Sequence, residues 1–420
     1  MDSIKKLYRI GNGPSSSHTM GPKKAADIFL AKNKDAKSFK VNLYGSLAST
    51  GKGHLTDKVI LDTLGKNTTV SFLPDVIKPF HHNALEFFSY DLEGKLMDRW
   101  LVYSIGGGEI VDGANKYSDD QEVYKLNCMA DILKYCEDKN ISLYDYVLEN
   151  EEDIMSYLDQ VFTQMISCVE GGLVKEGTLP GPLHVNRRAK VAYNKYIETK
   201  DIDKLIFASA LAASEENANG EVVVTAPTCG SCGVIPGILY AYFRRGLYTK
   251  KELIEGLAVA GLIGNLVKHN ASISGAEVGC QGEVGVACAM ASSMDAYLHK
   301  ATNKQIEYAA EIALEHHLGM TCDPVLGYVQ IPCIERNALS SKTAIDCSEY
   351  ARMTDGQHYV SLDSVIQSMA QTGKDLKEAY KETSLGGLAK TTLNKWVLLR
   401  ASSISTIIIR EYGAFLLLYI

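Results

Sequence analysis

The sequence feature that most constrains the fold is a change of pattern between residues 113 and 150. Before it, short β-rich runs alternate with glycine-containing turns and short helical stretches, which is typical of an α/β region. After it, long amphipathic runs alternate with segments rich in glycine, proline and cysteine, which indicates helices joined by functional loops. We therefore expect an α/β N-terminal domain followed by a larger all-α C-terminal domain.

The same patterns predict individual elements. In the first region we expect three strands and two helices, with strands over 39–44, 69–73 and 101–105 and helices over 20–31 and 56–64. Residues 115–145 are interpreted as a connection and a first helix. Beyond them we expect long helices over 154–171, 201–218, 251–268 and 304–317. The resulting domains are 1–145, 146–394 and an atypical apolar tail, 395–420.

Charge and composition exclude several classes of partner. The chain has 43 basic and 50 acidic residues, a net charge of −7, and they are mixed along its length, which argues against nucleic-acid binding. In the apolar tail, Arg400, Arg410 and Glu411 interrupt any run long enough to span a membrane. The first residues lack a signal-peptide core, so the ten cysteines are expected to be reduced thiols in a cytoplasmic protein.

Hydroxyl and imidazole groups are concentrated in one segment between Gly-Pro pairs. Ser15, Ser16, Ser17, His18 and Thr19 stand directly before a predicted helix. Backbone N–H groups at a helix start, together with hydroxyl donors, suit a carboxylate or a phosphate. A simple helix cap would need only one of these side chains. Three serines and a histidine exceed that need, so we expect an anion-binding loop.

His54 lies in a second glycine-rich turn, at residues 51–57, between a predicted strand and a predicted helix. An imidazole ordinarily titrates near pH ~6.5, which makes His54 a candidate general base. A plain surface position is the alternative for a histidine in a loop. The adjacent His81 and His82 are weaker candidates when the residues are considered alone.

Three cysteines lie in loops that glycine or proline makes accessible. Cys280 follows Gly279, Cys322 precedes Asp323-Pro324, and Cys333 follows Pro332. Such thiolates suit an iron–sulfur cluster, and three ligands on a four-iron cluster leave one iron open for Lewis-acid chemistry. No C-x-x-C spacing links these three cysteines, so a structural zinc site stays open as an alternative.

The other cysteines divide into two groups. Cys229 and Cys232 have C-x-x-C spacing, which is compatible with redox chemistry, metal binding or simple packing at a helix start, and we assign them no role. Five more lie in helical patterns and are expected in the core: Cys128, Cys136, Cys168, Cys288 and Cys347.

Taken together, these segments resemble the iron–sulfur L-serine dehydratases, also called L-serine ammonia-lyases, in their single-chain form. The resemblance runs from about residue 5 to about residue 394. Its most specific pieces are GPSSSHTMGP (13–22), YGSLASTGKGHLTD (44–57), YSIGGG (103–108), EGTLPGPL (176–183), TAPTCGSCGVIPG (225–237), NASISGAEVGCQGEVGVACAMA (270–291), GMTCDPVLGYVQIPCIERNA (319–338) and ETSLGGLA (382–389).

The resemblance implies an α/β domain that binds the substrate carboxylate and an all-helical domain that holds a [4Fe–4S] cluster. It assigns the cluster ligands to Cys280, Cys322 and Cys333. It assigns substrate binding to the loop Ser15, Ser16, Ser17, His18 and Thr19, and the proton-abstracting base to His54. The family's H-x-N-G-M segment appears here as HHNAL (81–85), with two departures, and on this basis His81 is assigned to substrate binding.

One departure from the family concerns the segment after ETSLGGLA. Family members often end shortly beyond it with a cysteine whose thiolate occupies the open iron until substrate displaces it. Here Asn394 is followed by Lys395 and an apolar extension, and no cysteine lies beyond Cys347. Without that thiolate, the fourth iron would carry water or the cluster would be less stable.

The activity implied by the resemblance is the dehydration and deamination of L-serine to pyruvate and ammonia, by elimination at a cluster iron, in a homodimer. Two alternatives stay open. The first is a lyase that acts on another small amino acid, such as threonine or cysteine. The second is a non-catalytic serine-binding protein, which the missing cysteine would favour.

Overall fold

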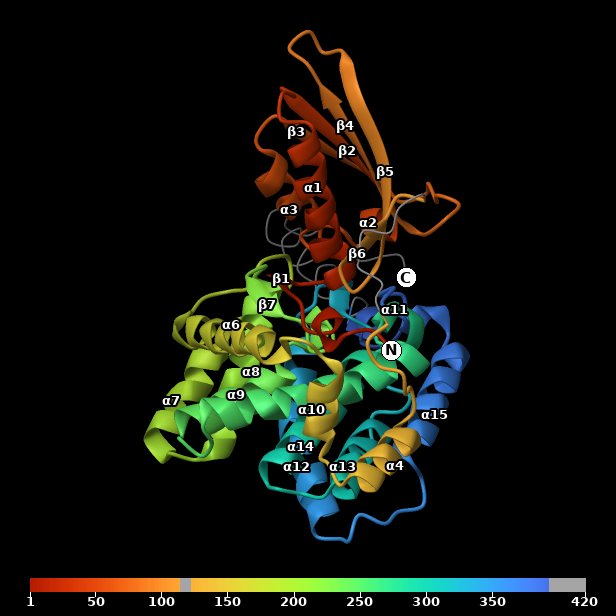
Figure 1. Ribbon diagram of the computed structural model, residues 1–420. Helices are drawn as coiled ribbons and strands as arrows, with labels where there is room; N and C mark the ends of the chain where they lie inside the picture. The colour runs from red at the N-terminus through yellow and green to blue at the C-terminus, as the bar shows by residue number, and fades with distance from the viewer. Residues whose placement is uncertain (114–121, 393–420) are drawn as a thin grey trace, which may run out of the picture.

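The computed structural model describes residues 1–113 and 122–392, and in it an α/β region lies against a larger helical region (Figure 1). This confirms the predicted fold class. The tail predicted over 395–420 lies outside the described residues. Among the helices of the described ranges, none combines the length and the apolar character needed to cross a bilayer.

The α/β region contains a five-stranded sheet with the strand order β3-β2-β4-β5-β6. The strands are β2 (Ser38–Gly45), β3 (Thr68–Leu73), β4 (Asn83–Tyr90), β5 (Leu96–Gly106) and β6 (Glu109–Val111). β2 and β3 are parallel, and the other neighbours are antiparallel. Two helices, α1 (Gly21–Lys32) and α3 (Thr56–Leu64), pack on the sheet, where Phe29 and Ile60 are fully buried. The short helix α2 (Ser46–Ser49) follows β2 directly.

The helical region surrounds α12, whose residues are nearly all buried and which packs against α9, α10, α13 and α14. The helices are α4 (Met129–Lys139), α5 (Leu143–Asn150), α6 (Ile154–Val174), α7 (Ala189–Thr199), α8 (Ile202–Ala218), α9 (Val234–Arg244), α10 (Lys250–Asn270), α11 (Gly275–Val278), α12 (Val286–Leu298), α13 (Asn303–Glu315), α14 (Cys333–Arg352) and α15 (Leu362–Asp375). Small residues such as Ala287, Ala289 and Ala291 let the neighbouring helices approach α12 closely.

The first residues of the chain pack into the helical region although they precede the α/β region in sequence. Ile4, Leu7 and Tyr8 are buried in the helical core, and the Tyr8 hydroxyl donates to the carbonyl oxygen of Leu257 at 2.9 Å. Strand β1 (Ile10–Asn12) then pairs antiparallel with β7 (Val222–Val224). The described part of the helical region therefore includes a two-stranded sheet, and its strand β7 was not expected from the sequence.

Most predicted elements agree with the structure. The helix predicted over 56–64 has these same bounds, and residues 115–145 contain α4 and the start of α5 in addition to the connection, where a single helix was expected. Four of the five predicted core cysteines are buried: Cys136, Cys168, Cys288 and Cys347. The prediction for Cys128 was wrong, because this residue is the half-exposed N-cap of α4.

Candidate functional site

Two adjoining cavities contain nearly all of the predicted site residues. The inner cavity is lined by the three serines of the anion loop and by the three loop cysteines, namely Ser15, Ser16, Ser17, Cys280, Cys322 and Cys333. The outer cavity has a volume of about 700 Å³ and is lined by His18 and His81. Ser17 and Glu382 line both cavities. Residues of the α/β region and of the helical region therefore line the same inner cavity.

The three cysteines come from three separate segments of the helical region. Cys280 directly precedes the π-helical turn Gln281–Gly285, which leads into α12, and Cys333 is the first residue of α14. Cys322 lies in a loop, and its backbone pairs with that of Lys381 in an isolated parallel β-bridge. Gly279 has a φ of 76°, a conformation that favours glycine, and its Cβ would lie 2.7 Å from the carbonyl oxygen of Met320. Glycine at position 279 thus allows the backbone to turn sharply directly before Cys280.

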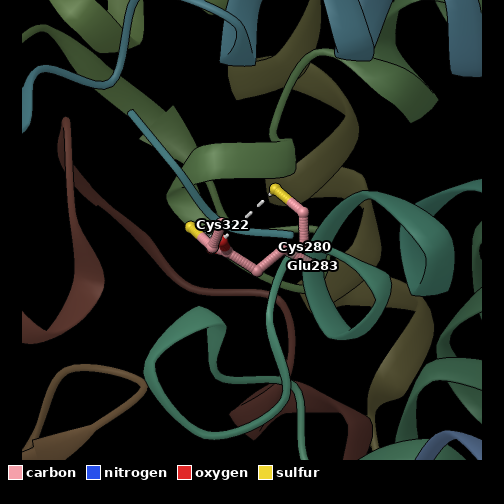
Figure 2. Close-up of side chains that lie close together, drawn as sticks. All are labelled: Cys280, Glu283 and Cys322. Atoms are coloured by element: carbon pink, nitrogen blue, oxygen red, sulfur yellow. Dashed lines mark hydrogen bonds between the residues drawn. The ribbon is translucent and has the colours of Figure 1, made fainter. Parts of the chain in front are cut away.

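Cys280, Cys322 and Glu283 lie close together, with their possible ligand atoms all within 4.8 Å of one another (Figure 2). The Cys322 thiol donates to Glu283 Oε2 at 3.6 Å, and Cys280 Sγ is 4.0 Å from the same oxygen. A hydrogen bond with Cys280, together with burial, raises the pKa of the Cys322 thiol. Burial likewise raises the pKa of Cys333. A metal cation that binds here must therefore displace protons from these thiols.

The carboxylate of Glu283 is fixed beside the thiols. The Thr228 hydroxyl donates to Glu283 Oε1 at 2.8 Å, and burial raises the pKa of Glu283. Two glycines leave the space that this side chain occupies. A Cβ on Gly275 would lie 2.5 Å from Glu283 Oε2, and one on Gly230 would lie 2.9 Å from Oε1. A side chain at either position would therefore push Glu283 out of place.

A positive charge lies next to the Cys322 loop. The Arg336 guanidinium donates to the carbonyl oxygen of Thr321 at 2.6 Å and to Asp323 Oδ1 at 3.1 Å. These two residues flank Cys322 in sequence, so Arg336 is held against the loop. A neighbouring cation favours the thiolate form of a cysteine, which is the form that binds metals.

On the opposite wall, the serine loop is ordered by its own hydrogen bonds. Ser15 caps the π-helical turn Ser16–Met20, which continues into α1, and its Oγ accepts from the His18 backbone N–H at 3.2 Å. Ser17 Oγ lies 3.0 Å from His18 Nδ1, and His18 Nε2 lies 3.1 Å from Ser46 Oγ. Burial, and then the nearby rings of His54 and His82, lower the pKa of His18, so this ring is neutral at neutral pH.

Thr19 differs from the rest of the loop, because it is fully buried and lines neither cavity. Its hydroxyl donates to the carbonyl oxygen of His54 at 2.7 Å and accepts from the Ser15 backbone N–H at 3.2 Å. In this structure Thr19 ties the serine loop to the turn that carries His54.

His54 is only 1% exposed and lies just behind the cavity walls. Its ring centroid is 4.6 Å from that of His18, and its Nε2 is 3.7 Å from Glu382 Oε1. Neither ring nitrogen has a hydrogen-bond partner within the described residues. Burial lowers the pKa of His54 to about 4 and raises that of Glu382 to about 8. At neutral pH the structure therefore brings a neutral imidazole next to a protonated carboxyl group.

His81 is half-buried in the wall of the outer cavity and lies outside the inner cavity. Its Nδ1 accepts from the Asn83 backbone N–H at 3.0 Å, and its ring stacks on that of His82 with centroids 4.3 Å apart. Burial, and then the neighbouring His82, lower the pKa of His81.

Sequence reasoning assigned no role to two acidic residues of this site, Glu283 and Glu382. Glu283 follows Cys280 by three residues in a glycine-rich turn, and an acidic residue so placed next to a candidate ligand is a signal that could have identified it. Glu382 is the first residue of the ETSLGGLA motif, but that motif does not reveal its contact with His54, which is far away in sequence. Only the fold brings the side chains of Glu382 and His54 together.

The chain is similar to known proteins along nearly all of its described length. The family model described as serine dehydratase alpha chain matches residues 45–389, and the one described as serine dehydratase beta chain matches residues 3–78. Between them, the two matched ranges include the serine loop, His54 and all three loop cysteines.

Curated relatives match the chain over almost its full length. An L-serine dehydratase of Haemophilus influenzae is 40% identical, with 93% of this chain and 99% of the relative covered. L-serine dehydratase 2 of Escherichia coli is 40% identical, with coverage of 93% and 98%. An L-serine dehydratase of Streptomyces coelicolor is 39% identical, with coverage of 92% and 98%.

Proposed function

We propose that this chain, which belongs to the serine dehydratase family, is an L-serine ammonia-lyase that converts L-serine to pyruvate and ammonia with the aid of a [4Fe–4S] cluster. One observation carries the proposal: the serine loop and the three cysteines line the same cavity. A carboxylate-binding surface and a soft metal-binding surface that face each other suit a small amino acid with a leaving group.

The residues of the inner cavity fit an iron–sulfur cluster. Cys280, Cys322 and Cys333 offer three thiols from three segments, which is the donor chemistry that such clusters require. Glycines border the site, and Arg336 brings a positive charge that favours thiolates. When bound there, the cluster would supply a Lewis-acidic iron for the departing β-hydroxyl group.

The serine loop is assigned to the substrate carboxylate. Ser15, Ser16 and Ser17 line the inner cavity at the start of a helical segment, where free backbone N–H groups attract anions. The Ser15 and Ser17 side chains are already held by hydrogen bonds to each other and to His18, so these two side chains lose little conformational freedom when substrate binds. His18 Nδ1 lies within hydrogen-bond distance of Ser17 Oγ and so helps to orient this hydroxyl group. His81 borders the outer cavity, through which we expect the substrate to enter.

His54 is assigned as the base that removes the α-proton. A base must be unprotonated, and burial keeps this imidazole neutral at neutral pH. Because neither ring nitrogen has a hydrogen-bond partner among residues 1–113 and 122–392, its lone pair is available to accept a proton. Glu382 lines both cavities and its Oε1 lies 3.7 Å from His54 Nε2, so we expect the substrate α-carbon to meet His54 beside this carboxyl group.

The proposed reaction balances without another reagent. His54 receives the α-proton, the electron pair of the C–H bond forms the new C=C bond, and the β-hydroxyl group leaves with the electrons of the C–O bond. The proton that His54 took is then released and converts the departed hydroxide to water, so the products are aminoacrylate and water. Aminoacrylate tautomerises to an imine, and water hydrolyses the imine to pyruvate and ammonia. The chain needs to hold the substrate only until elimination, because the later steps occur without catalysis.

Anaerobic purification of the full chain tests the proposal. We expect iron and acid-labile sulfide in equal amounts, a brown colour, and release of pyruvate and ammonia from L-serine. Threonine and cysteine, assayed in parallel, test whether another small amino acid is the preferred substrate. A colourless zinc protein would contradict the cluster. A loaded cluster without turnover of any of these amino acids would favour a serine-binding protein instead.

The proposal also includes location, assembly and domain organisation. All ten cysteines are free, which supports a reducing compartment such as the cytoplasm. We propose a homodimer, which light scattering on the purified protein tests. We also propose that residues 1–145 bind the substrate carboxylate and that residues 146–394 hold the cluster. Separate expression of these two parts, with activity measured before and after mixing, tests that division.

A further inference from the structure

A third cavity, with a volume of about 600 Å³, lies between the packed helices α13 and α14 and shares no lining residue with the inner and outer cavities. We call it the α13–α14 cavity. The helices line it with Tyr308, Glu311, Ile312 and Glu315 from α13 and Thr343, Asp346, Cys347 and Tyr350 from α14. Each set has the spacing i, i+3, i+4, i+7, which places its four side chains on one helix face. The cavity has the size of a small-molecule site.

A buried carboxyl group without a partner lines this cavity. Glu311 is 2% exposed, and its Oε1 has no hydrogen-bond partner in the part of the chain that the structure describes. Burial, and then the charges of Glu315 and Glu307, raise the pKa of Glu311 to about 8. A buried polar atom left without a partner costs free energy. A cation that donates a hydrogen bond to Oε1 would remove this cost and would favour the ionised carboxylate.

The charges around the cavity are mainly negative. Burial, and then the charges of Asp346, Glu311 and Glu315, raise the pKa of the Cys347 thiol to about 12, so three carboxylates act on one point of the lining. Lys342 Nζ lies 3.6 Å from Asp346 Oδ1 and compensates that charge in part. Within the two described ranges, no basic side chain forms an ion pair with Glu311 or Glu315. A positively charged ligand would supply the counter-charge.

Aromatic rings form another part of the lining. The His358 ring stacks on that of Tyr308, with centroids 4.1 Å apart, and its Nε2 lies 3.0 Å from Glu307 Oε2, which fixes the ring. The Tyr350 ring meets that of Tyr308 edge to face at 6.2 Å. The other histidine of the lining, His316, has its Nδ1 bonded to its own helix. Aromatic faces attract organic cations and also pack against apolar groups.

The geometry selects among the possible cations. A metal ion needs several ligand atoms close together, and the one such group of three found in residues 1–113 and 122–392 is Cys280, Glu283 and Cys322, far from this cavity in the lining sets. An amino acid such as L-serine carries a carboxylate, which Glu311 and Glu315 would repel. A primary ammonium group has N–H donors for the unpartnered oxygen, and an apolar body suits the rings.

We propose that the α13–α14 cavity binds a primary organic ammonium ion, whose N–H groups donate to Glu311 while its apolar body packs against Tyr308 and Ile312. The inference is independent of the proposed function, because the cavity has its own lining.

Isothermal titration calorimetry of the full chain with 2-phenylethylammonium chloride tests the proposal. We expect saturable binding with a Kd of ~1 mM or below, and at least ~10-fold weaker binding of the neutral analogue 2-phenylethanol. Glu311→Gln keeps the shape of the side chain and removes its charge, and it should weaken amine binding ~10-fold. The matched control is Glu349→Gln, at an exposed position of α14 outside the cavity, which should bind the amine like the wild type.

Three results would overturn the proposal: no saturable binding of the amine, equal binding of 2-phenylethanol, or equal affinity of the wild type and Glu311→Gln. Should Glu311→Gln fail to fold, Glu315→Lys replaces it, because this residue is exposed at the cavity. The new positive charge should also weaken amine binding ~10-fold, and an unchanged affinity would contradict the proposal. Since binding is measured without turnover, a failure of the proposed function leaves this test unaffected.

Discussion

The two walls of the inner cavity are built in different ways. On the α/β wall, Ser17, His18 and Ser46 form a chain of hydrogen bonds. On the helical wall, the thiols of Cys280 and Cys322 contact Glu283 and each other through weak sulfur hydrogen bonds. The first wall is thus organised by hydrogen bonds of ordinary length, whereas the thiols of the second wall make only long, weak contacts within the chain. We expect the two walls to respond differently to mutation.

The largest effect should come from a ligand of the helical wall. In Cys280→Ala we expect cluster iron and serine turnover to fall to background, because two remaining predicted thiols cannot retain the cluster. The far-ultraviolet circular dichroism should stay unchanged, since the α/β wall does not depend on the cluster. Cys168→Ala, at a buried cysteine outside the cavity, is the control and should keep both iron and activity. Normal iron content in Cys280→Ala would contradict the ligand assignment.

A change at His54 should remove turnover while sparing the cluster. For His54→Gln we expect kcat to fall by about 10²–10⁴-fold, the usual contribution of a general base. Iron, sulfide and visible absorbance should match the wild type, because His54 belongs to the other wall. His316→Gln, at an exposed position after α13, serves as the control. A kcat close to that of the wild type would show that another group removes the proton.

The α/β wall should also lose stability as pH falls. Burial lowers the pKa of His54 to about 4, whereas the unfolded chain binds the proton near pH ~6.5. Below that pH the unfolded state takes up more protons, so the free energy of unfolding should fall by about 2 kcal/mol between pH 7 and pH 5 from this group alone. Burial also lowers the pKa of His18, so this residue adds to the loss of stability as pH falls.

Urea unfolding followed by Trp100 fluorescence, at pH 7 and pH 5, measures this loss in the α/β sheet when the other tryptophan is removed by Trp396→Phe in every protein compared. The wild type should lose more stability over this range than His54→Gln, which has no imidazole at that position. Equal losses in the two proteins would mean that His54 titrates normally in the folded state.

The smallest effects should distinguish two residues of the serine loop. Ser17→Ala should raise KM for L-serine by ~10-fold with a smaller change in kcat, since Ser17 lines both cavities. Thr19→Val should leave KM nearly unchanged and lower the free energy of unfolding by about 1–3 kcal/mol, because two buried groups lose their partner. Steady-state kinetics and urea titrations of both variants provide the comparison. If instead Thr19→Val raised KM and Ser17→Ala lowered only the free energy of unfolding, Thr19 would be the substrate-binding residue and Ser17 the structural one.

The parts of this molecule that sequence predicts well are those decided by neighbouring residues. Helix α3 has an amphipathic pattern and a following glycine, and its predicted bounds agree with the structure. Strand β4 was not predicted, because it lies between β2 and β5 and is buried on both faces, which removes the alternation of polar and apolar residues. Its buried Glu86, held by Tyr44 and Arg99, obscures the pattern further.

For the site, the chemical groups could be identified from sequence motifs, whereas their positions relative to one another are visible only in the fold. The motifs identified the serine loop and the three cysteines, and the structure brings both sets to one cavity. The burial of His54 could not be read from its turn, because its packing comes from His18 and from Glu382 of the helical region. Contacts between segments so distant in sequence leave no periodic signal in either one.

The pairing of β1 with β7 has a consequence for the order in which the chain folds. During synthesis, Ile4 and Tyr8 leave the ribosome early, but the Glu151 carboxylate that binds the Ile4 N–H lies 147 residues downstream, and the Leu257 carbonyl that binds the Tyr8 hydroxyl lies 249 residues downstream. The α/β sheet and the helices that pack on it can fold in the meantime, because their core consists of residues from their own region. The first segment must therefore stay unpaired until late, and its docking is a long-range, slow event that completes the helical core.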